Sequence, residues 1–179
     1  MSHLRDVALE KSYRLLNHGP VTLVTFEHEG AGNVMAASWV MPLDFDPPKL
    51  LLVLDSNTYS RGLLEGSGTF VINLPCRQHA EFTLAAGNCT GREQDKFALF
   101  GITPQRARVV QAPIVPDCLA YLECRVIEEP GVQQRHDLFV AQVIAAYADE
   151  RTFSNGRWHF PDDDLRTLHY SAGGTFYLT

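Results

Sequence analysis

The sequence predicts a mainly β fold, a β-barrel with a few short peripheral α-helices. Six or seven segments have the length and apolar pattern of strands, and several follow one another closely enough to pair antiparallel. The regular strand–helix–strand alternation that builds a parallel sheet is missing from the sequence. The helical patterns are short and lie between strands, so we expect these helices around the outside of a barrel.

Length and composition indicate a single domain spanning residues 1–179, long enough to bury a sizeable core. The net charge of −6, from 15 basic and 21 acidic residues, argues against binding to nucleic acid or to an anionic membrane. Charged residues interrupt the N-terminal segment, so no signal peptide is expected, and no apolar run approaches the ~18 residues of a membrane span. We therefore expect a cytoplasmic protein.

Neither the cysteines nor the histidines are spaced like metal ligands. The four cysteines form no C-x-x-C pair, so we expect free thiols in a reducing compartment. The seven histidines show neither H-E-x-x-H nor H-x-H spacing, which argues against zinc. The acidic run Asp162–Asp164 is expected to be a solvated loop. The sequence therefore predicts no metal site.

The first half of the chain is rich in strand patterns. Val7–Leu16 has the spacing of a short amphipathic helix. Pro42–Pro48 is expected to be a loop, because two adjacent prolines cannot lie in a central strand. The continuous apolar run Leu50–Leu54 predicts a strand buried on both faces. Strands are predicted over Val21–Phe26, Asn33–Val40 and Lys49–Asp55.

The second half continues the same pattern. Apolar and polar residues alternate from Tyr121 onward, which places Glu123 and Arg125 on the solvent face of a half-buried strand. Glu128–Arg135 is expected to be a loop. Strands are predicted over Thr69–Leu74, Leu119–Ile127 and Leu138–Tyr147, and short helices over Tyr59–Glu65, His79–Ala86 and Gln94–Phe100.

A hydroxyl-rich turn follows the apolar strand that ends at Asp55. Ser56 or Thr58 is a suitable N-cap for the helix that begins near Tyr59. A strand, such a turn and a helix N-terminus together form an anion site, at which hydroxyls and Arg61 can donate to a phosphate. Taken alone, however, a run of this kind is more often a plain helix cap.

The neighbouring strand carries small residues, Ala36-Ala37-Ser38, followed by Trp39. Small side chains let a flat ligand approach the backbone, while the serine and the tryptophan offer a donor and a ring face. A planar ring system with a phosphate tail would use both this strand and the hydroxyl-rich turn.

Other familiar site motifs are missing from the sequence. There is no G-x-G-x-x-G, no G-x-x-x-x-G-K-[ST] and no G-x-S-x-G. Lys96, near the start of a helix, opposes the helix dipole and is expected to have an anionic partner, with plain solvation as the alternative. If the chain folds back, Lys96 could complete the phosphate site. His136 leads into a buried strand and is a candidate for a pocket mouth, although it is equally well read as an ordinary loop histidine.

A series of short motifs extends from about Leu15 to Tyr177. It includes Leu15–Val21, Asn33–Met35, Ala37–Val40, Asp46–Pro48, Phe70–Pro75, Gly91-Arg92, Asp95–Phe97, Leu122–Val126, His136, Leu138–Val140 and Leu168–Tyr170. In their order and spacing together, these motifs resemble the flavin reductase-like, FMN-binding split-barrel family, most of all its flavoredoxin branch.

The resemblance implies a homodimer of split β-barrels with FMN near the subunit interface. It also implies that Lys96 pairs with the FMN phosphate, and that His136, the catalytic candidate, lies near the nicotinamide site and orients the electron donor. The isoalloxazine ring would then be lined by Met35, Ala37, Ser38, Trp39 and Val40, and the ribityl chain and phosphate would be held by Asp55, Ser56, Thr58, Tyr59 and Ser60.

By this resemblance the chain would be an NAD(P)H:flavin oxidoreductase, with NADH or NADPH as co-substrate and with a redox partner protein or a flavin-dependent monooxygenase as partner. Two positions depart from the family pattern. Gln134-Arg135 replaces Gly-Asp before the histidine, and Ala141-Gln142 replaces Gly-Glu in the strand. An FMN-binding electron carrier or flavin store is therefore the alternative, and a barrel that binds haem or a pyridoxine phosphate is a third reading.

Overall fold

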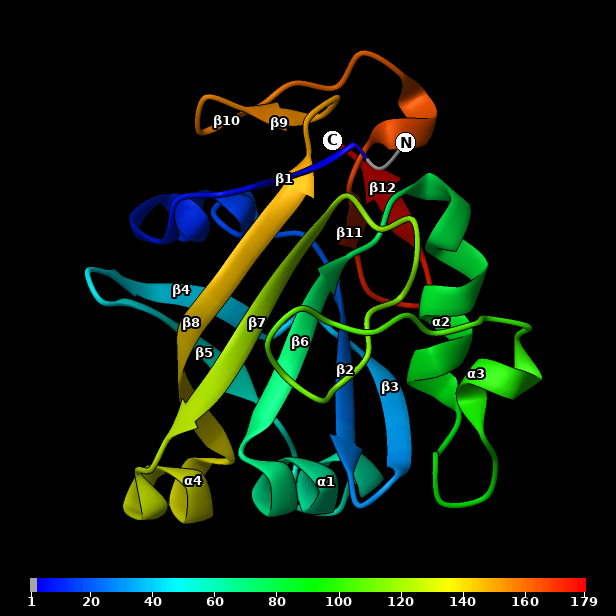
Figure 1. Ribbon diagram of the computed structural model, residues 1–179. Coiled ribbons are helices and arrows are strands. Elements are labelled where there is room, and N and C mark those ends of the chain that lie inside the picture. The colour runs from blue at the N-terminus through cyan, green and yellow to red at the C-terminus, as the bar shows by residue number, and fades with distance from the viewer. Residues whose placement is uncertain (1–2) are drawn as a thin grey trace.

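The computed structural model describes residues 3–179 and is built around one curved antiparallel sheet (Figure 1). The strands run in the order β3-β2-β6-β7-β8-β5-β4, and β1 pairs with β8 outside this path. β3 and β4 are consecutive in the chain, yet they lie at opposite ends of this order. The sheet therefore curls into an open barrel whose two edges are linked through Ser38 and Trp39. This confirms the predicted mainly β fold.

Two small hairpins, β9–β10 and β11–β12, lie at one end of the barrel (Figure 1). The strands of the main sheet are β1 (Leu4–Asp6), β2 (Thr22–His28), β3 (Ala31–Ala37), β4 (Val40–Phe45), β5 (Pro48–Val53), β6 (Thr69–Leu74), β7 (Ala120–Ile127) and β8 (Leu138–Asp149). The hairpin strands are β9 (Phe153–Ser154), β10 (Arg157–Trp158), β11 (Leu168–Tyr170) and β12 (Phe176–Leu178).

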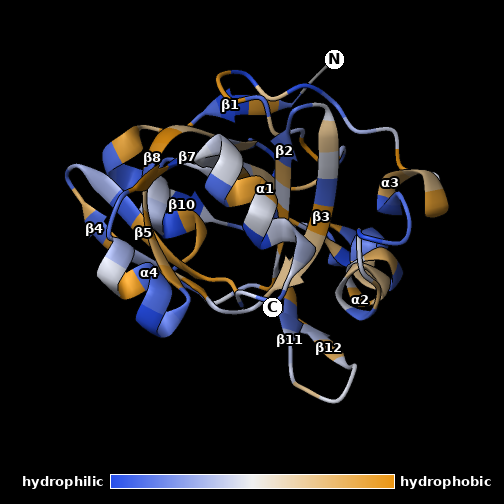
Figure 2. Cartoon of the chain, turned by 90° about the horizontal axis from the view of Figure 1, so that it is seen from below, coloured by the Kyte–Doolittle hydropathy of each residue, from blue (hydrophilic) through white to orange (hydrophobic). Residues whose placement is uncertain are grey.

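Short helices surround the sheet. α1 and α4 lie together at the end of the barrel opposite the small hairpins, and α2 and α3 lie beside β3 (Figures 1 and 2). Within residues 3–179, no helix has both the length and the apolar composition that crossing a bilayer requires. The helices are α1 (Tyr59–Ser67), α2 (Ala80–Asn88), α3 (Lys96–Leu99) and α4 (Pro130–His136), and the 3₁₀ helices are η1 (Leu9–Leu15), η2 (Arg77–His79) and η3 (Asp163–Leu165).

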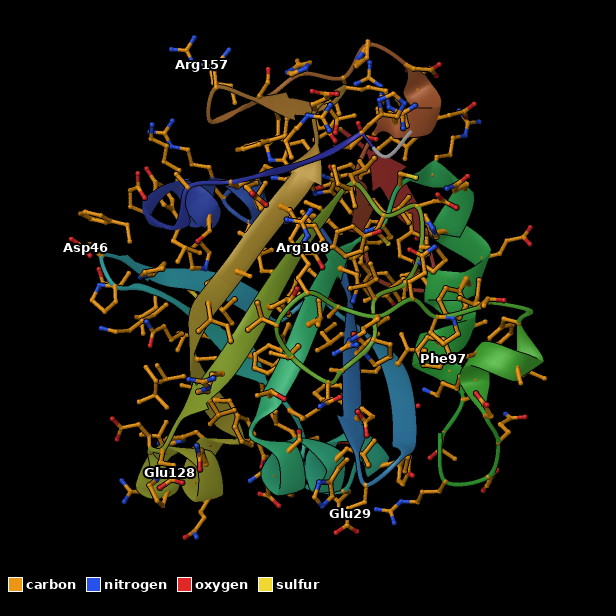
Figure 3. All side chains as sticks on the ribbon, in the orientation of Figure 1. Glu29, Asp46, Phe97, Arg108, Glu128 and Arg157 are labelled. Carbon is orange, nitrogen blue, oxygen red and sulfur yellow. The ribbon has the colours of Figure 1, made fainter. Side chains whose placement is uncertain are left out.

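Two apolar clusters form the core, one on each side of the sheet. The inner cluster fills the barrel and includes Phe26, Leu52 and Phe70, each fully buried. The outer cluster lies between the sheet and α2, α3 and the segment that leads to β7, and it includes Phe82 and Phe97 (Figure 3). Because side chains alternate across a strand, one set of strands supplies both clusters.

The predicted loop over Pro42–Pro48 is wrong. Most of this segment belongs to the β4–β5 hairpin, whose tip lies at Asp46 (Figure 3). β4 is an edge strand and its register shifts between Pro42 and Asp44, so Pro42 is tolerated there. The Asp46–Pro47 peptide bond is cis, and Pro48 is the first residue of β5.

Two other expectations fail for local reasons. Glu128–Arg135 is largely helical, with Pro130 at the first position of α4, where its missing N–H costs nothing. The run Leu50–Leu54 is not buried on both faces: Leu50 and Leu52 are buried, whereas Leu51 and Val53 are partly exposed. The outer face of the β4–β5 hairpin is therefore apolar and open.

Candidate functional site

Three adjoining cavities follow β3 and its continuation to Trp39. The first, which we call the polar pocket, has a volume of about 280 Å³ and lies between β3, α1 and the connection from α2 to α3. The second, the strand-edge pocket, has a volume of about 250 Å³ and is lined by residues 35–39 with Val53, Asp55 and Thr58. The third, the hairpin pocket, has a volume of about 180 Å³ and lies between β3, α2 and the β11–β12 hairpin. All three share Ala36.

Lys96 lies in the wall of the polar pocket and is only 4% exposed. Asp95 accepts hydrogen bonds from the first N–H groups of α3 and so fixes the start of this helix. The Lys96 ammonium donates to the carbonyl of Ala86, 2.7 Å away in the last turn of α2. Burial lowers the pKa of Lys96, and no carboxylate of residues 3–179 forms an ion pair with it. A buried cation with only neutral partners favours the entry of an anion.

Asn33 is the second buried polar side chain of this pocket, at 3% exposed. Its amide nitrogen donates to Ser60 Oγ at 2.9 Å, while its Oδ1 has no partner in the described part of the chain. Gly91 crosses directly over Asn33, and a Cβ at this glycine would collide with Oδ1 and with the Tyr59 ring. An unsatisfied buried acceptor is costly, so a ligand hydroxyl or N–H is expected to donate to it.

The turn between β5 and α1 is ordered by its own side chains. Asp55 Oδ1 accepts from the backbone N–H of Asn57 at 2.7 Å, and the Thr58 hydroxyl donates to the Asp55 carbonyl at 2.8 Å. Thr58 is the N-cap of α1, but its side chain makes no capping hydrogen bond. Thr58, Tyr59 and Ser60 line the polar pocket, as does Asn57, whereas Ser56 is exposed and lines none of the three cavities.

The expectation that Arg61 donates to a phosphate is wrong. Its guanidinium donates to the carbonyl of Leu54 at 2.9 Å, to Asp137 at 2.9 Å and to Glu65 at 2.6 Å. A further hydrogen bond goes to the carbonyl of Gln133 in α4. Arg61 therefore joins α1 to α4 and to the start of β8, and these four hydrogen bonds use four of its five N–H donors.

The strand-edge pocket brings together the small residues predicted to face a flat ligand. Met35, Ala37, Ser38 and Trp39 all line it. Within residues 3–179, β3 pairs with β2 and with no other strand, so the backbone groups along its other edge are open to a ligand. Val40, also predicted to line the ring, is buried in the inner cluster and lines none of the three cavities.

His136 is not brought into any of the three cavities. It is the last residue of α4, is exposed, and precedes the left-handed residue Asp137. The Asp137 carbonyl accepts from the Leu54 N–H at 2.8 Å, which places this turn beside the end of β5. His136 is therefore near the rim of the strand-edge pocket without lining it.

Two features of the hairpin pocket were not predicted. Tyr170 and Phe176, from the β11–β12 hairpin, form one wall of it. Thr83 of α2 lies in the opposite wall, fully buried, and its hydroxyl has no partner within residues 3–179. In the sequence, a tail of short strands far from β3 carried no sign of this contact.

The family model for the flavin reductase like domain matches residues 14–176, nearly the whole chain. The chain belongs to the flavin reductase-like family. This confirms the resemblance found in the sequence, and the members of this family are oxidoreductases.

This flavin reductase-like protein is also similar in sequence or structure to individual proteins along most of its length. The uncharacterized protein YddH of Escherichia coli K12 is 41% identical over 98% of this chain and 95% of its own length. A crystal structure from Shewanella baltica OS155, described as an FMN-binding domain of a flavin reductases-like enzyme, superposes with a TM-score of 0.95 at 43% identity, over 98% of this chain and 94% of that one. Flavoredoxin of Desulfovibrio vulgaris (Miyazaki F) superposes with a TM-score of 0.78 at 25% identity, over 90% of this chain and 86% of that one.

No cluster of three or more potential metal ligands occurs among residues 3–179. All four cysteines are free thiols, as predicted.

Proposed function

We propose that this chain binds FMN and acts as an NAD(P)H:flavin oxidoreductase. The observation that carries the proposal is the polar pocket, where a buried ammonium and an unpartnered amide oxygen adjoin an open strand edge. A phosphate beside Lys96 would neutralise that cation, and a ribityl hydroxyl would donate to Asn33 Oδ1. Lys96 and the α1 N-terminus both favour an anion here.

The remaining predicted residues are proposed to hold the rest of the cofactor. The hydroxyls of Thr58 and Ser60, with Asp55, Ser56 and Tyr59, would contact the ribityl chain and the phosphate. The flat ring would lie in the strand-edge pocket, against the backbone of residues 35–40, beside the ring of Trp39. When bound, FMN supplies the redox chemistry, and the protein positions it and excludes competing reactions.

His136 is proposed to orient a nicotinamide donor at the rim of the strand-edge pocket. Its exposure suits contact with a donor that arrives from solvent, and its attachment through Asp137 to β5 and Arg61 keeps it beside the pocket. No proton transfer is assigned to it.

Absorbance spectroscopy of the purified protein tests the proposal. We expect the visible flavin band in the protein as isolated or after FMN is added and excess FMN removed. Anaerobic addition of NADH and then of NADPH should bleach this band and identify the donor. Protein that shows no flavin band after incubation with FMN would contradict FMN binding. A haem or pyridoxal-type spectrum would indicate instead a barrel that binds haem or a pyridoxine phosphate.

An electron carrier or flavin store is the second candidate. It is favoured by the position of His136 outside the cavities and by Gln134-Arg135 and Ala141-Gln142, where the sequence departs from the family pattern. In stopped-flow experiments without other proteins, this candidate predicts that neither nicotinamide bleaches bound FMN quickly. Rapid bleaching would rule it out, and slow bleaching would direct the search toward a protein donor such as a redox partner.

A second copy of this chain is proposed to cover the outer face of the β4–β5 hairpin. Trp39, Met41, Leu43 and Phe45 are 74%, 56%, 50% and 63% exposed, and Leu51 and Val53 lie beside them. Contiguous apolar surface of this kind marks an interface. Because Trp39 and Val53 also line the strand-edge pocket, a partner here would help to close it.

Light scattering coupled to size exclusion tests the dimer. Wild-type protein should elute with the mass of two chains, and Met41→Lys should shift the equilibrium toward the monomer, because a charge is costly to bury in an apolar interface. Glu128→Lys, on an exposed residue beyond the hairpin, is the matched control (Figure 3). A monomeric wild-type protein at all concentrations would contradict the proposal.

A further inference from the structure

Cys89 differs from the other three cysteines in its surroundings. Cys76, Cys118 and Cys124 are buried, at 1%, 3% and 0% exposed. Cys89 is partly exposed and lies immediately after α2, in the wall of the polar pocket. It is therefore the thiol that a reagent can reach, and a reagent would reach it from inside or beside that pocket.

The pocket around Cys89 is built for an anion. Cys89 is close enough to Lys96 that its thiolate form would raise the pKa of the Lys96 ammonium. That ammonium is held by the carbonyl of Ala86, three positions before Cys89 in the chain. Asn33 Oδ1, buried and without a partner in the described residues, independently indicates that a ligand occupies the same pocket.

A group attached to Cys89 would compete with such a ligand for space. The pocket has a volume of about 280 Å³, and Cys89, Thr90 and Gly91 form one side of it. Gly91 lies tightly against Asn33 and Tyr59, so an adduct on Cys89 and a ligand would have to share the same volume. An adduct that carries carboxylates would also place its charge beside Lys96, where the phosphate of FMN is proposed to lie.

We propose that Cys89 is a modification site for small anionic disulfides, and that its modification and FMN binding exclude each other. This inference rests on the proposed function. The Cys89 thiolate attacks one sulfur of the disulfide, a new S–S bond forms to Cys89, and the other half leaves as a thiolate that takes up the proton lost by Cys89. Cys89 is thereby oxidised, one half of the disulfide is reduced, and a thiol reductant reverses the step.

The first experiment follows thiol reactivity with 5,5′-dithiobis(2-nitrobenzoate), itself an anionic disulfide. Native protein freed of flavin should show one fast-reacting thiol. Cys89→Ser should lack it, while Cys118→Ser, a change at a buried cysteine, should keep it. FMN at about 100 times its Kd should slow the fast reaction about 100-fold, because only the free protein reacts. Cystamine, a cationic disulfide, should react more slowly than the anionic reagent.

The second experiment reverses the order. Protein treated with oxidised glutathione should lose FMN binding in a fluorescence titration and regain it after dithiothreitol. Cys89→Ser should keep the FMN affinity it had before treatment, and Cys89→Ala serves if the serine variant does not fold. An FMN affinity unchanged by adduct formation, or a thiol rate unchanged by bound FMN, would overturn the inference while leaving FMN binding intact. Untreated protein that binds no FMN would instead overturn the proposed function, and this inference with it.

Discussion

At the scale of single residues, we expect Lys96 to determine how strongly the polar pocket binds an anion. Lys96→Met removes the charge and keeps most of the side-chain volume. FMN binding should weaken by about 1.5–3 kcal/mol, the usual contribution of a charge-assisted hydrogen bond. The binding of riboflavin, which lacks the phosphate, should weaken much less. Fluorescence titration with both ligands measures the difference.

Lys11→Met is the matched control for this prediction, since Lys11 is exposed and lines none of the three cavities around β3. It should leave both affinities unchanged. An equal loss for FMN and riboflavin in Lys96→Met would mean that Lys96 supports the fold of the pocket and does not contact a phosphate.

Asn33 provides a second prediction at this scale. Asn33→Asp keeps the shape of the side chain but places a carboxylate beside Ser60 and the proposed phosphate. FMN binding should weaken by about 1.5–3 kcal/mol or more, since the new carboxylate repels the phosphate and no longer donates to Ser60 Oγ. The loss should shrink as pH falls and the carboxylate is protonated, which titrations at a series of pH values can follow. A pH-independent loss would contradict the charge argument.

The sequence predicted these residues unevenly. The position of Lys96 at a helix start indicated an anionic partner, and the carbonyl of Ala86 meets part of that need in the structure. Asn33 was missed as a site residue, although a polar residue inside an apolar strand was visible. Arg61 was assigned to the wrong partner because its hydrogen bonds go to α4 and Asp137, and α4 had been predicted as a loop.

At the scale of elements, the segment between α3 and β7 depends on Glu123. Alternation along β7 predicted that Glu123 faces solvent, but this segment covers it completely. Its carboxylate accepts from the backbone N–H groups of Arg108, Val109 and Val110 at 2.8, 2.7 and 2.9 Å, and from the Tyr147 hydroxyl at 3.1 Å. Figure 3 shows Arg108 on the segment that crosses this face of the sheet.

Glu123→Gln should therefore destabilise the fold. A carboxamide offers one acceptor oxygen and turns its own N–H groups toward backbone donors, so we expect a loss of about 2–4 kcal/mol in the free energy of unfolding. Urea denaturation measures it. Glu128→Gln, at an exposed residue just after β7, should change stability little. Equal effects of the two substitutions would show that the hydrogen bonds to Glu123 contribute nothing measurable.

Other elements show why the strands were easier to predict than their connections. β6 coincides with the predicted strand Thr69–Leu74, because its apolar run is bounded by Gly68 and Pro75. The β4–β5 hairpin was hidden, since three prolines within seven residues argue against strands unless the strand lies at an edge. Edge position is a property of the whole sheet, and no local pattern carries it.

At the scale of the whole molecule, the site exists because distant segments meet. The polar pocket combines β3, the N-terminus of α1 and the connection that ends at Lys96. A fold-back of the chain places Lys96 in the same pocket as Thr58 and Ser60 but not Ser56, and the phosphate site that these residues would form stays a prediction. The contribution of the C-terminal hairpin could not be predicted, because it depends on the curvature that brings Tyr170 against β3 and α2.

The C-terminal hairpin is attached to the barrel through two neutral histidines. His169 Nδ1 lies 3.0 Å from the Gly19 carbonyl, so this nitrogen carries the proton and Nε2 accepts from Thr167 Oγ1 at 3.1 Å. The hydroxyl of Thr167 then accepts from His18 Nε2 at 3.0 Å. His18 Nδ1 is left as a buried lone pair without a partner in the described chain. A proton on His169 Nε2 would remove the acceptor of the Thr167 hydroxyl, and a proton on His18 Nδ1 would create a buried donor without a described partner.

Stability should therefore fall in mild acid. Burial and the neighbouring His169 lower the pKa of His18 from its ordinary value of 6.5 to about 4. Burial also lowers the pKa of His169 and of His79. Between pH 6.5 and about 4, His18 binds more protons in the unfolded chain than in the folded one. The stability contributed by neutral His18 is therefore complete above pH 6.5 and is lost as pH falls toward 4.

For His18 alone this loss should be about 2–3 kcal/mol in the free energy of unfolding. Urea denaturation at a series of pH values measures it. His18→Gln, which stays neutral, should flatten the profile between pH 6.5 and about 4, although it starts from a lower stability at neutral pH. His159→Gln, at an exposed position, should keep the wild-type slope. A wild-type slope in His18→Gln would show that other groups cause the acid sensitivity and that this histidine pair does not control how the hairpin is attached.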